Sequence, residues 1–151
     1  ELVPELKIRY VNISELTSIG LGDLCDHGAC STEADVNRFF TKDKPVIFNY
    51  HGYVNDVEQI LWPYTQSERY ILHGYTEEGS TTTPFDMAVS NGVSCYHVAM
   101  DLVERGAINN PAVAKKRDMI VDMMKKKIAH HQAYIKKFGN DPDEINKLKW
   151  I

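Results

Sequence analysis

Residues 44–53 read KPVIFNYHGY, and residues 70–75 read YILHGY. The first stretch carries a nearly continuous apolar run from Val46 to Tyr50. Such a run is typical of a strand that is buried on both faces, as in a parallel sheet. The two stretches therefore predict strands over residues 44–51 and 70–75, each with a His-Gly-Tyr sequence at its carboxyl end.

The rest of the chain alternates between strand and helix patterns before it becomes wholly helical. Leu6–Ile13 alternates in polarity and predicts a strand, residues 17–30 indicate a long loop, and residues 31–40 and 54–61 favour short helices. Three longer helices follow, with caps at Thr83, Ser94 and Asn110 and ends at Asn91, Gly106 and Gly139, and a last helical turn lies within residues 141–150. This order of elements predicts a layered α/β domain.

Length and composition exclude several broad classes of protein. The 151 residues correspond to about one domain, so we treat residues 1–151 as a single domain. Contents of 43% hydrophobic and 25% charged residues are ordinary globular values and exclude intrinsic disorder. No apolar run approaches the roughly 18 residues of a membrane helix, and a net charge of −4 argues against nucleic acid as a partner. Three cysteines without a signal-like segment favour a cytoplasmic location.

The two His-Gly-Tyr sequences form the sharpest candidate for a site. The carboxyl ends of strands line the ligand crevice of an open α/β sheet, so we expect one site to contain His51, Tyr53, His73 and Tyr75. Four hydroxyls that lead into a capped helix can add an anion site: Ser80, Thr81, Thr82 and Thr83. The alternative is that the glycines only turn the chain, that the aromatic rings pack, and that Thr83 is only a helix cap.

Other polar residues give weaker signals. Cys25, His27 and Cys30 share one loop, but their spacing fits no four-ligand zinc pattern, so we predict no metal site. The chain lacks a glycine-rich phosphate loop and a nucleophile elbow, and we predict no catalytic and no cofactor-binding residue in it.

The helix expected over residues 111–138 carries eight basic and two acidic residues. This asymmetry fits a solvated face, and the alternative is contact with an acidic partner or an anionic ligand. His131 falls within the apolar stripe of the same helix, where a hydrogen-bonded interior histidine is the ordinary outcome.

Four stretches, in this order along the chain, resemble one known family. They are LKIRYVN (residues 6–12), TKDKPVIF (41–48), HGY (51–53) and GYTEEGSTTTPFDM (74–87). Together with the lysine-rich last helix and the terminal Leu148-Lys149-Trp150, they resemble the C-terminal domain of xylulose 5-phosphate/fructose 6-phosphate phosphoketolase over nearly the whole chain. The run TTTPFDM is the most specific of these motifs.

The resemblance implies a parent enzyme that depends on thiamine diphosphate and magnesium and is several times longer than this chain. The parent is expected to cleave xylulose 5-phosphate, and often fructose 6-phosphate, with phosphate to acetyl phosphate and an aldose phosphate. Its N-terminal and middle domains, the implied partners of this chain, would bind the cofactors and form at least a dimer. This chain would support the structure and the dimer without catalysing. Alternatively, the crevice near His51, His73 and Ser80–Thr83 binds an anionic regulatory metabolite or lies at the substrate entrance.

The resemblance also implies a fold. It is the three-layer transketolase C-terminal type, with a mostly parallel sheet and helices on both faces. In that fold a strand and a helix precede the segment that matches Leu6–Ile13. Because this chain opens on Glu1 directly before that segment, we expect a fragment of a longer chain that lacks both elements and self-associates through an uncovered sheet edge.

Overall fold

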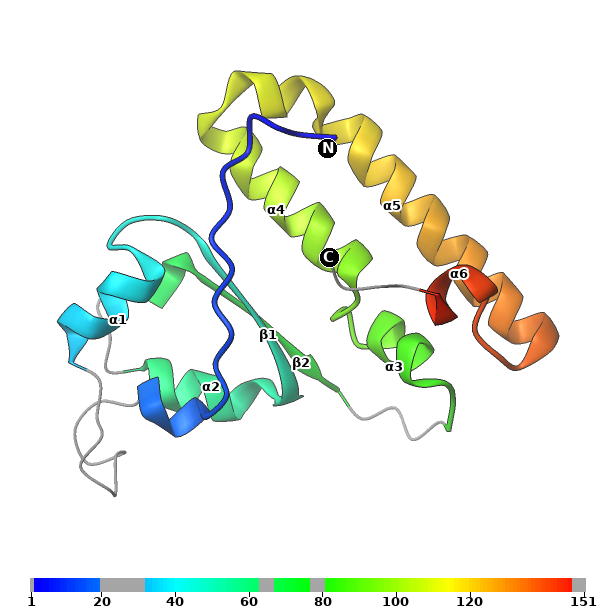
Figure 1. Cartoon of the computed structure of the whole chain (residues 1–151), viewed down its shortest axis with the longest axis horizontal. Coiled ribbons are helices and arrows are strands. Elements are labelled where there is room, and N and C mark those ends of the chain that lie inside the picture. Colours follow the sequence, from blue (N-terminus) through cyan, green and yellow to red (C-terminus); the bar gives the residue numbers. More distant parts are fainter. Residues whose placement is uncertain (1, 20–31, 63–66, 77–80, 148–151) are drawn as a thin grey trace. The chain divides into compact units, whose positions relative to one another are not determined.

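The computed structural model describes residues 2–19, 32–62, 67–76 and 81–147 (Figure 1). The chain divides into two compact units. The first, here named the sheet unit, comprises Ile8–Tyr75, and the second, the helical unit, comprises Glu1–Lys7 together with Thr76–Ile151.

The sheet unit is built on two parallel strands joined by a helix. β1 (Val46–Tyr53) leads directly into α2 (Val54–Leu61), and β2 (Tyr70–Tyr75) returns beside β1 in parallel register. The other described elements of this unit are η1 (Leu16–Ile19), α1 (Glu33–Phe40) and η3 (Ser67–Arg69). The α/β class and the parallel sheet expected from the sequence are confirmed.

One hydrophobic core joins these elements. Its buried members come from η1, α1, β1 and α2: Ile19, Val36, Phe40, Phe48, Val57 and Leu61. Burial alternates along β1, where Phe48 is buried while Asn49 and His51 are exposed. The prediction of a strand buried on both faces is therefore wrong within the described residues, because only one face of β1 meets the core formed with α1 and α2.

Residues 8–13 run extended but join no strand ladder within the described part of the chain. The guanidinium of Arg9 donates hydrogen bonds to the carbonyl oxygens of Arg38 and Phe39, at 2.9 and 3.1 Å. Two side chains of the segment pack against the sheet-unit core. The strand predicted over Leu6–Ile13 is thus not formed, because side-chain contacts rather than backbone pairing hold this segment.

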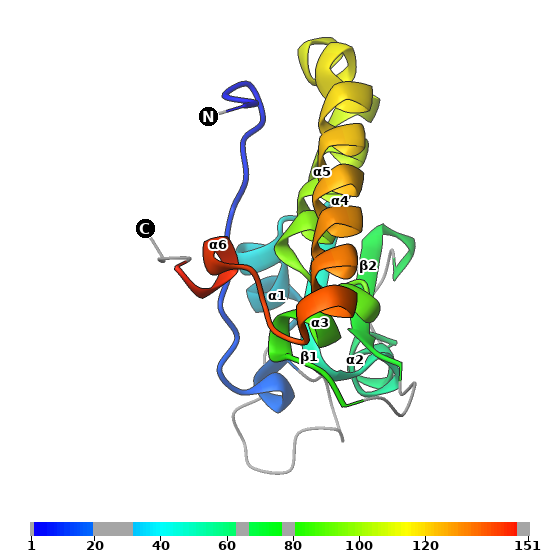
Figure 2. The same cartoon turned by 90° about the vertical axis from the view of Figure 1, so that its right-hand side faces the viewer.

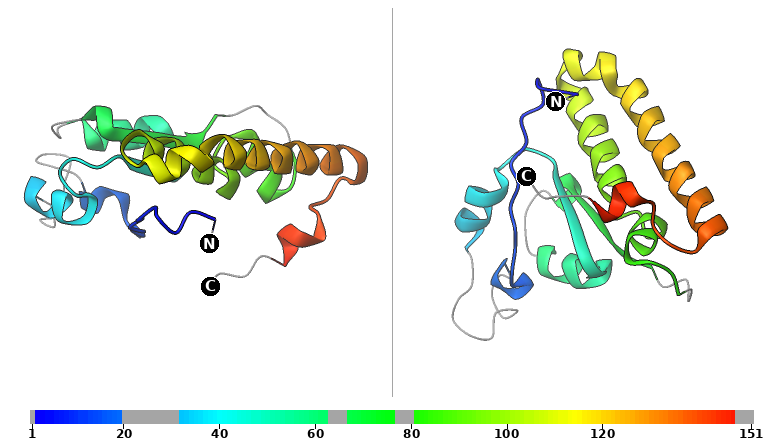
Figure 3. Two further views of the ribbon diagram at one scale, coloured as in Figure 1. Left: turned by 90° about the horizontal axis from the view of Figure 1, so that it is seen from above. Right: turned by 45° about the vertical axis from the view of Figure 1, so that its right-hand side comes forward.

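The helical unit is built on two long antiparallel helices (Figures 1 and 3). α4 (Cys95–Asn109) and α5 (Pro111–Phe138) are joined by Asn110, whose side-chain oxygen accepts hydrogen bonds from the first amides of α5. α5 ends before Gly139, whose φ of 70° is the left-handed conformation that glycine adopts without strain. The buried apolar side chains of this pair are Val103, Val113, Ile120 and Met124. α3 (Pro84–Ser90) and α6 (Asp143–Asn146) are its other described helices.

Helix α4 continues through Gly106, where the sequence predicts its end. A Cβ atom at Gly106 would lie 2.5 Å from Cδ1 of Leu6, so the absent side chain makes room for the N-terminal residues. Leu6 and Val3 pack against the core between α4 and α5. The glycine therefore permits a close contact inside the helix instead of ending it.

Two further expectations from the sequence concern membrane-spanning helices and the number of layers in the fold. Among the helices that the structure describes, none combines the length and the apolar character needed to cross a lipid bilayer. The three-layer arrangement with helices on both faces of the sheet stays a prediction.

Candidate functional site

The aromatic half of the predicted site lies at the carboxyl ends of β1 and β2. The hydroxyl of Tyr75 and Nδ1 of His51 share a hydrogen bond, and their rings meet edge to face with centroids 4.9 Å apart. The strand register pairs Tyr53 with Tyr75 and His73 with Asn49. The sheet therefore brings His51, Tyr53 and Tyr75 together, as the sequence predicts, and the His51–Tyr75 pair is open to solvent.

The glycines of both His-Gly-Tyr sequences have a packing role. A Cβ atom at Gly74 would lie 2.5 Å from the carbonyl oxygen of Gly52, so the two strand ends approach closely only without a side chain there. A Cβ atom at Gly52 would lie 2.5 Å from the ring of Tyr50. Close packing thus accounts for both glycines whether or not a ligand binds beside them.

The hydroxyl half of the predicted site belongs to the helical unit. Thr83 caps α3, where its Oγ1 accepts a hydrogen bond from the amide of Asp86 at 3.2 Å and donates to Oδ1 of Asp141 at 2.7 Å. Thr82 donates to the carboxylate of Asp86 at 2.7 Å, and Thr81 is exposed. These carboxylates disfavour an anion beside Thr82 and Thr83.

Part of the predicted site therefore stays untested. Ser80 lies outside the described residues. The aromatic residues and the threonines belong to different compact units, and a joint site formed by the two groups stays a prediction.

The structure contains a buried polar cluster around His131 that the sequence analysis did not predict. The imidazole is 2% exposed, and its Nε2 lies 3.4 Å from Oδ1 of Asp86 and 3.6 Å from Oδ1 of Asp141. The ring of Phe85 meets it edge to face at 5.0 Å. Its burial confirms the expected interior histidine, but neither ring nitrogen has a hydrogen-bond partner among the described residues. No spacing rule points to Asp86 and Asp141, because they lie 55 positions apart in the sequence.

The cluster joins three parts of the helical unit. Asp86 lies in the first turn of α3, His131 lies on α5, and Asp141 follows the end of α5. Thr82 and Thr83 satisfy one oxygen of each carboxylate. The imidazole thus lies within 3.6 Å of carboxylates from two separate segments, and the cluster links α3, α5 and the residues after α5 inside the helical unit.

The described residues hold no group of three or more His, Cys, Asp or Glu side chains arranged to bind a metal ion. Cys25, His27 and Cys30 lie outside the described residues. Cys95 is a free thiol at the start of α4, and partial burial raises its pKa, which disfavours the nucleophilic thiolate.

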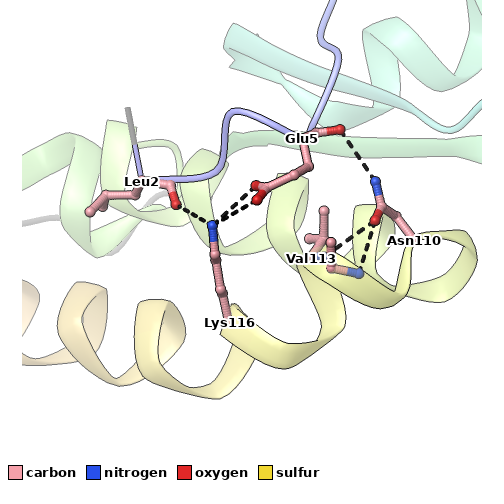
Figure 4. A network of polar contacts seen from close by, with 6 residues as sticks. Leu2, Glu5, Asn110, Val113 and Lys116 are labelled. Atoms are coloured by element: carbon pink, nitrogen blue, oxygen red, sulfur yellow. Dashed lines mark hydrogen bonds and ion pairs between the residues drawn. The ribbon is translucent and has the colours of Figure 1, made fainter.

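The basic residues of α5 mostly lie on an exposed surface. Lys116 binds the N-terminal segment, where its ammonium donates to the Glu5 carboxylate at 3.0 Å and to the Leu2 carbonyl oxygen at 3.4 Å (Figure 4). Lys126 pairs with Asp122 at 2.7 Å within the helix. The solvated face and the acidic-partner interpretations both remain predictions for the rest of this surface.

The chain matches one known family and several curated proteins. Residues 1–150 match the family described as XFP C-terminal domain. The chain is 39% identical over 151 residues to a probable phosphoketolase 2 of Rhizobium meliloti, covering 100% of this chain and 19% of that protein. It is 41% identical over 143 residues to a probable phosphoketolase of Schizosaccharomyces pombe, covering 95% of this chain and 17% of that protein.

A probable phosphoketolase of Clostridium acetobutylicum is 35% identical over 150 residues, which are 99% of this chain and 18% of that protein. The chain thus spans less than a fifth of the length of the curated relatives it matches. The resemblance to phosphoketolases is confirmed. The chain belongs to the XFP C-terminal domain family, which is the C-terminal domain of phosphoketolases.

Proposed function

We propose that this chain supports the structure and the dimer of a phosphoketolase without catalysing the reaction itself. In this proposal the parent enzyme cleaves xylulose 5-phosphate, fructose 6-phosphate or both, with phosphate to give acetyl phosphate and an aldose phosphate. The observation that carries this proposal is the match of the whole chain to a small fraction of much longer phosphoketolases.

The cofactors belong to other parts of the proposed enzyme. Thiamine diphosphate is held through magnesium, which prefers carboxylate and other oxygen ligands. The described residues gather no such set, and the carboxylates of Asp86 and Asp141 are engaged with threonine hydroxyls and His131. Following the resemblance to phosphoketolases, we propose that the N-terminal and middle domains of the parent bind both cofactors. The cytoplasmic location expected from the cysteine usage of the sequence is part of this proposal.

The test compares three proteins: the full-length enzyme, the same enzyme without residues 1–151, and this chain alone. Acetyl phosphate is measured with xylulose 5-phosphate or fructose 6-phosphate, phosphate, thiamine diphosphate and magnesium, and the dimer is followed by sedimentation velocity. We expect activity in the full-length enzyme, none in the chain alone, and a weakened dimer after deletion. Activity of the isolated chain contradicts a supporting role, and a silent full-length enzyme contradicts the substrates.

The exposed His51–Tyr75 pair favours a second candidate, a regulatory domain that binds an anionic metabolite. An imidazole and a phenol hydroxyl lie at the carboxyl ends of two parallel strands, where α/β sheets bind ligands. Titration with phosphate, nucleotide and phosphoenolpyruvate, followed by NMR, tests this function. Shifts confined to His51, Tyr53 and Tyr75 support it, and an unchanged spectrum rules it out for these ligands.

A further inference from the structure

A groove along α5 belongs to neither the sheet-edge site nor the His131 cluster. Its lining on α5 consists of exposed or half-buried side chains: Met119, Asp122, Met123, Lys126, Lys127 and His130. Leu2 of the N-terminal segment and Glu144 of α6 complete the groove, which encloses about 650 Å³. Helix α6 and residues 2–7 lie on one side of the α4–α5 pair (Figures 2 and 3).

One end of the groove is apolar and open to solvent. Met119 is 58% exposed and Leu2 is 53% exposed, while Met123 is partly buried against the helical core. Neighbouring exposed apolar side chains with polar residues around them mark surfaces that meet another molecule. Methionine side chains are flexible and adapt to the surface that they contact. This end of the groove therefore suits a polypeptide partner better than it suits water.

The charged side chains of the groove can accept further partners. Lys126 binds Oδ2 of Asp122 at 2.7 Å within the helix. A carboxylate accepts hydrogen bonds at both oxygens, so this pair leaves Oδ1 of Asp122 to accept from a second cation. Lys127 forms no ion pair among the described residues, and its ammonium lies 5.7 Å from the centre of the Tyr96 ring. The groove thus presents a cation at Lys127 and an open carboxylate oxygen at Asp122.

The lining residues of α5 have the same spacing in both directions along the helix. From Met119 to His130 the steps are 3, 1, 3, 1 and 3 residues. Residues three and four apart share one face of a helix, so the six residues form one stripe about 16 Å long. Such a stripe can pack against its own copy in the antiparallel direction, because a two-fold axis at its midpoint exchanges its two halves.

This exchange brings complementary side chains together. Across the axis, Met119 meets His130 of the second copy, Asp122 meets Lys127 of the second copy, and Met123 meets Lys126 of the second copy. A thioether packs favourably at the edge of an aromatic ring, and the opposite charges attract. The aliphatic stem of a lysine can cover a methionine while its ammonium stays on a carboxylate. A parallel arrangement would instead place each charged side chain beside its own copy, and like charges repel.

We propose that this groove is an isologous contact between two copies of the chain, in which their α5 helices lie antiparallel along the stripe from Met119 to His130. The inference rests on the proposed role of this chain in the dimer and names a contact that performs it. The stripe spans about three helical turns, which is less than the roughly 800 Å² per partner of a stable interface requires. The contact therefore adds to a dimer that other parts of the parent enzyme also hold.

Disulfide cross-linking in the full-length parent enzyme tests the contact. The double variant carries Met119→Cys and His130→Cys, and both residues are exposed, so the substitutions leave the core intact. Within one helix these positions lie about 16 Å apart, whereas a disulfide needs Cα atoms within about 7 Å of each other. A disulfide between them therefore joins two copies. After mild oxidation we expect at least threefold more linked dimer from the double variant than from either single variant, with mass spectrometry to locate the bond.

Control variants separate this contact from chance collisions and from unfolding. Lys125→Cys with Lys136→Cys has the same spacing of eleven residues on another exposed face of α5 and should give no link. Lys127→Glu, added to the first double variant, should lower the yield of linked dimer at least threefold, while Lys125→Glu should leave it unchanged. Circular dichroism checks that each variant is folded. If the double variant unfolds, Lys127→Glu and Lys125→Glu alone are compared by sedimentation velocity, and only Lys127→Glu should weaken the dimer.

A full-length dimer without a disulfide between positions 119 and 130 overturns the contact and leaves the proposed dimer role standing. Linked dimer from Met119→Cys alone indicates another arrangement of the helices and also overturns it. A link from either position to a different part of the parent enzyme assigns the groove to that part and has the same consequence. A full-length enzyme that stays monomeric contradicts both the contact and the proposed dimer role.

Discussion

His131 is buried beside two carboxylates that are themselves only 14% and 11% exposed. Its ring also meets the ring of Phe85 edge to face at 5.0 Å, so removing the imidazole leaves an empty buried space beside Phe85 and the two carboxylates. A large side chain removed from a buried site destabilises a fold because a cavity remains.

We therefore expect His131→Ala to lower the free energy of unfolding by about 2 to 4 kcal/mol, because the imidazole is fully buried. His130→Ala is the matched control, since His130 precedes it on the same helix, is exposed, and should change the free energy by less than about 0.5 kcal/mol. Urea unfolding monitored by circular dichroism measures the free energy of unfolding of both variants. Equal midpoints for the two variants would contradict a stabilising role of the buried His131 cluster.

Two glycines should respond in opposite ways to alanine. At Gly74 the new Cβ meets the backbone carbonyl of Gly52, which moves only if the strands separate, so Gly74→Ala should destabilise by about 1 to 3 kcal/mol. At Gly106 the close contact, 2.5 Å, is with the end of the Leu6 side chain, the Val113 side chain lies at an ordinary 3.5 Å, and alanine favours the helix by about 1 kcal/mol. Gly106→Ala should therefore be neutral or stabilising. Thermal unfolding measures the stability of both variants. The reverse order of stability would refute both assignments.

At the scale of elements, residues 2–7 are held on the α4–α5 pair by apolar packing and by one ion pair. Leu6 and Val3 supply the packing, and Lys116 binds the Glu5 carboxylate (Figure 4). The hydrogen bond from Lys116 is the largest cause that lowers the pKa of Glu5. A lowered pKa in the folded chain means that the ionised carboxylate stabilises this contact.

This contact should therefore depend on pH. Its contribution is present above the ordinary pKa of a glutamate, about 4.3, and is lost as the pH falls through the lowered value in the folded chain. The amide chemical shifts of residues 2–7 should change over this acidic range. Glu5→Gln should remove the change, and a pH-independent spectrum of the parent chain would contradict the assignment.

At the scale of the whole molecule, the isolated chain presents apolar side chains and strand edges to solvent. Ile8 and Tyr10 are 58% and 80% exposed on an extended segment, and the described sheet has two strands. Unpaired strand edges are templates for association.

We expect the isolated chain to associate as its concentration rises, as the sequence also predicts. Sedimentation velocity over a concentration series measures this. Tyr10→Lys should weaken the association, because it replaces an exposed aromatic ring of the extended segment with a charge that opposes strand pairing. Phe138→Lys, a change of another exposed aromatic residue on α5, is the control and should have less effect. A monomer at every concentration contradicts the prediction.

The sequence by itself determined the elements whose signals are local. The apolar run after Lys44, the Thr83 and Asn110 caps and the Gly139 end each act through neighbouring residues, and each forms where expected. The family could also be identified from the sequence, because the run through TTTPFDM is long and specific. The His51–Tyr75 contact followed from strand ends that meet at one edge of a parallel sheet.

Only the tertiary structure decided the features that join distant residues. Leu6 lies over Gly106, so a residue that ordinarily ends a helix lies inside one. The extended segment from Ile8 finds side-chain partners instead of a strand, and local polarity patterns cannot distinguish the two. Asp86 and Asp141 meet at His131 because α3 and the end of α5 pack together. Such contacts depend on how surfaces far apart in sequence come together in three dimensions, which spacing along the chain does not encode.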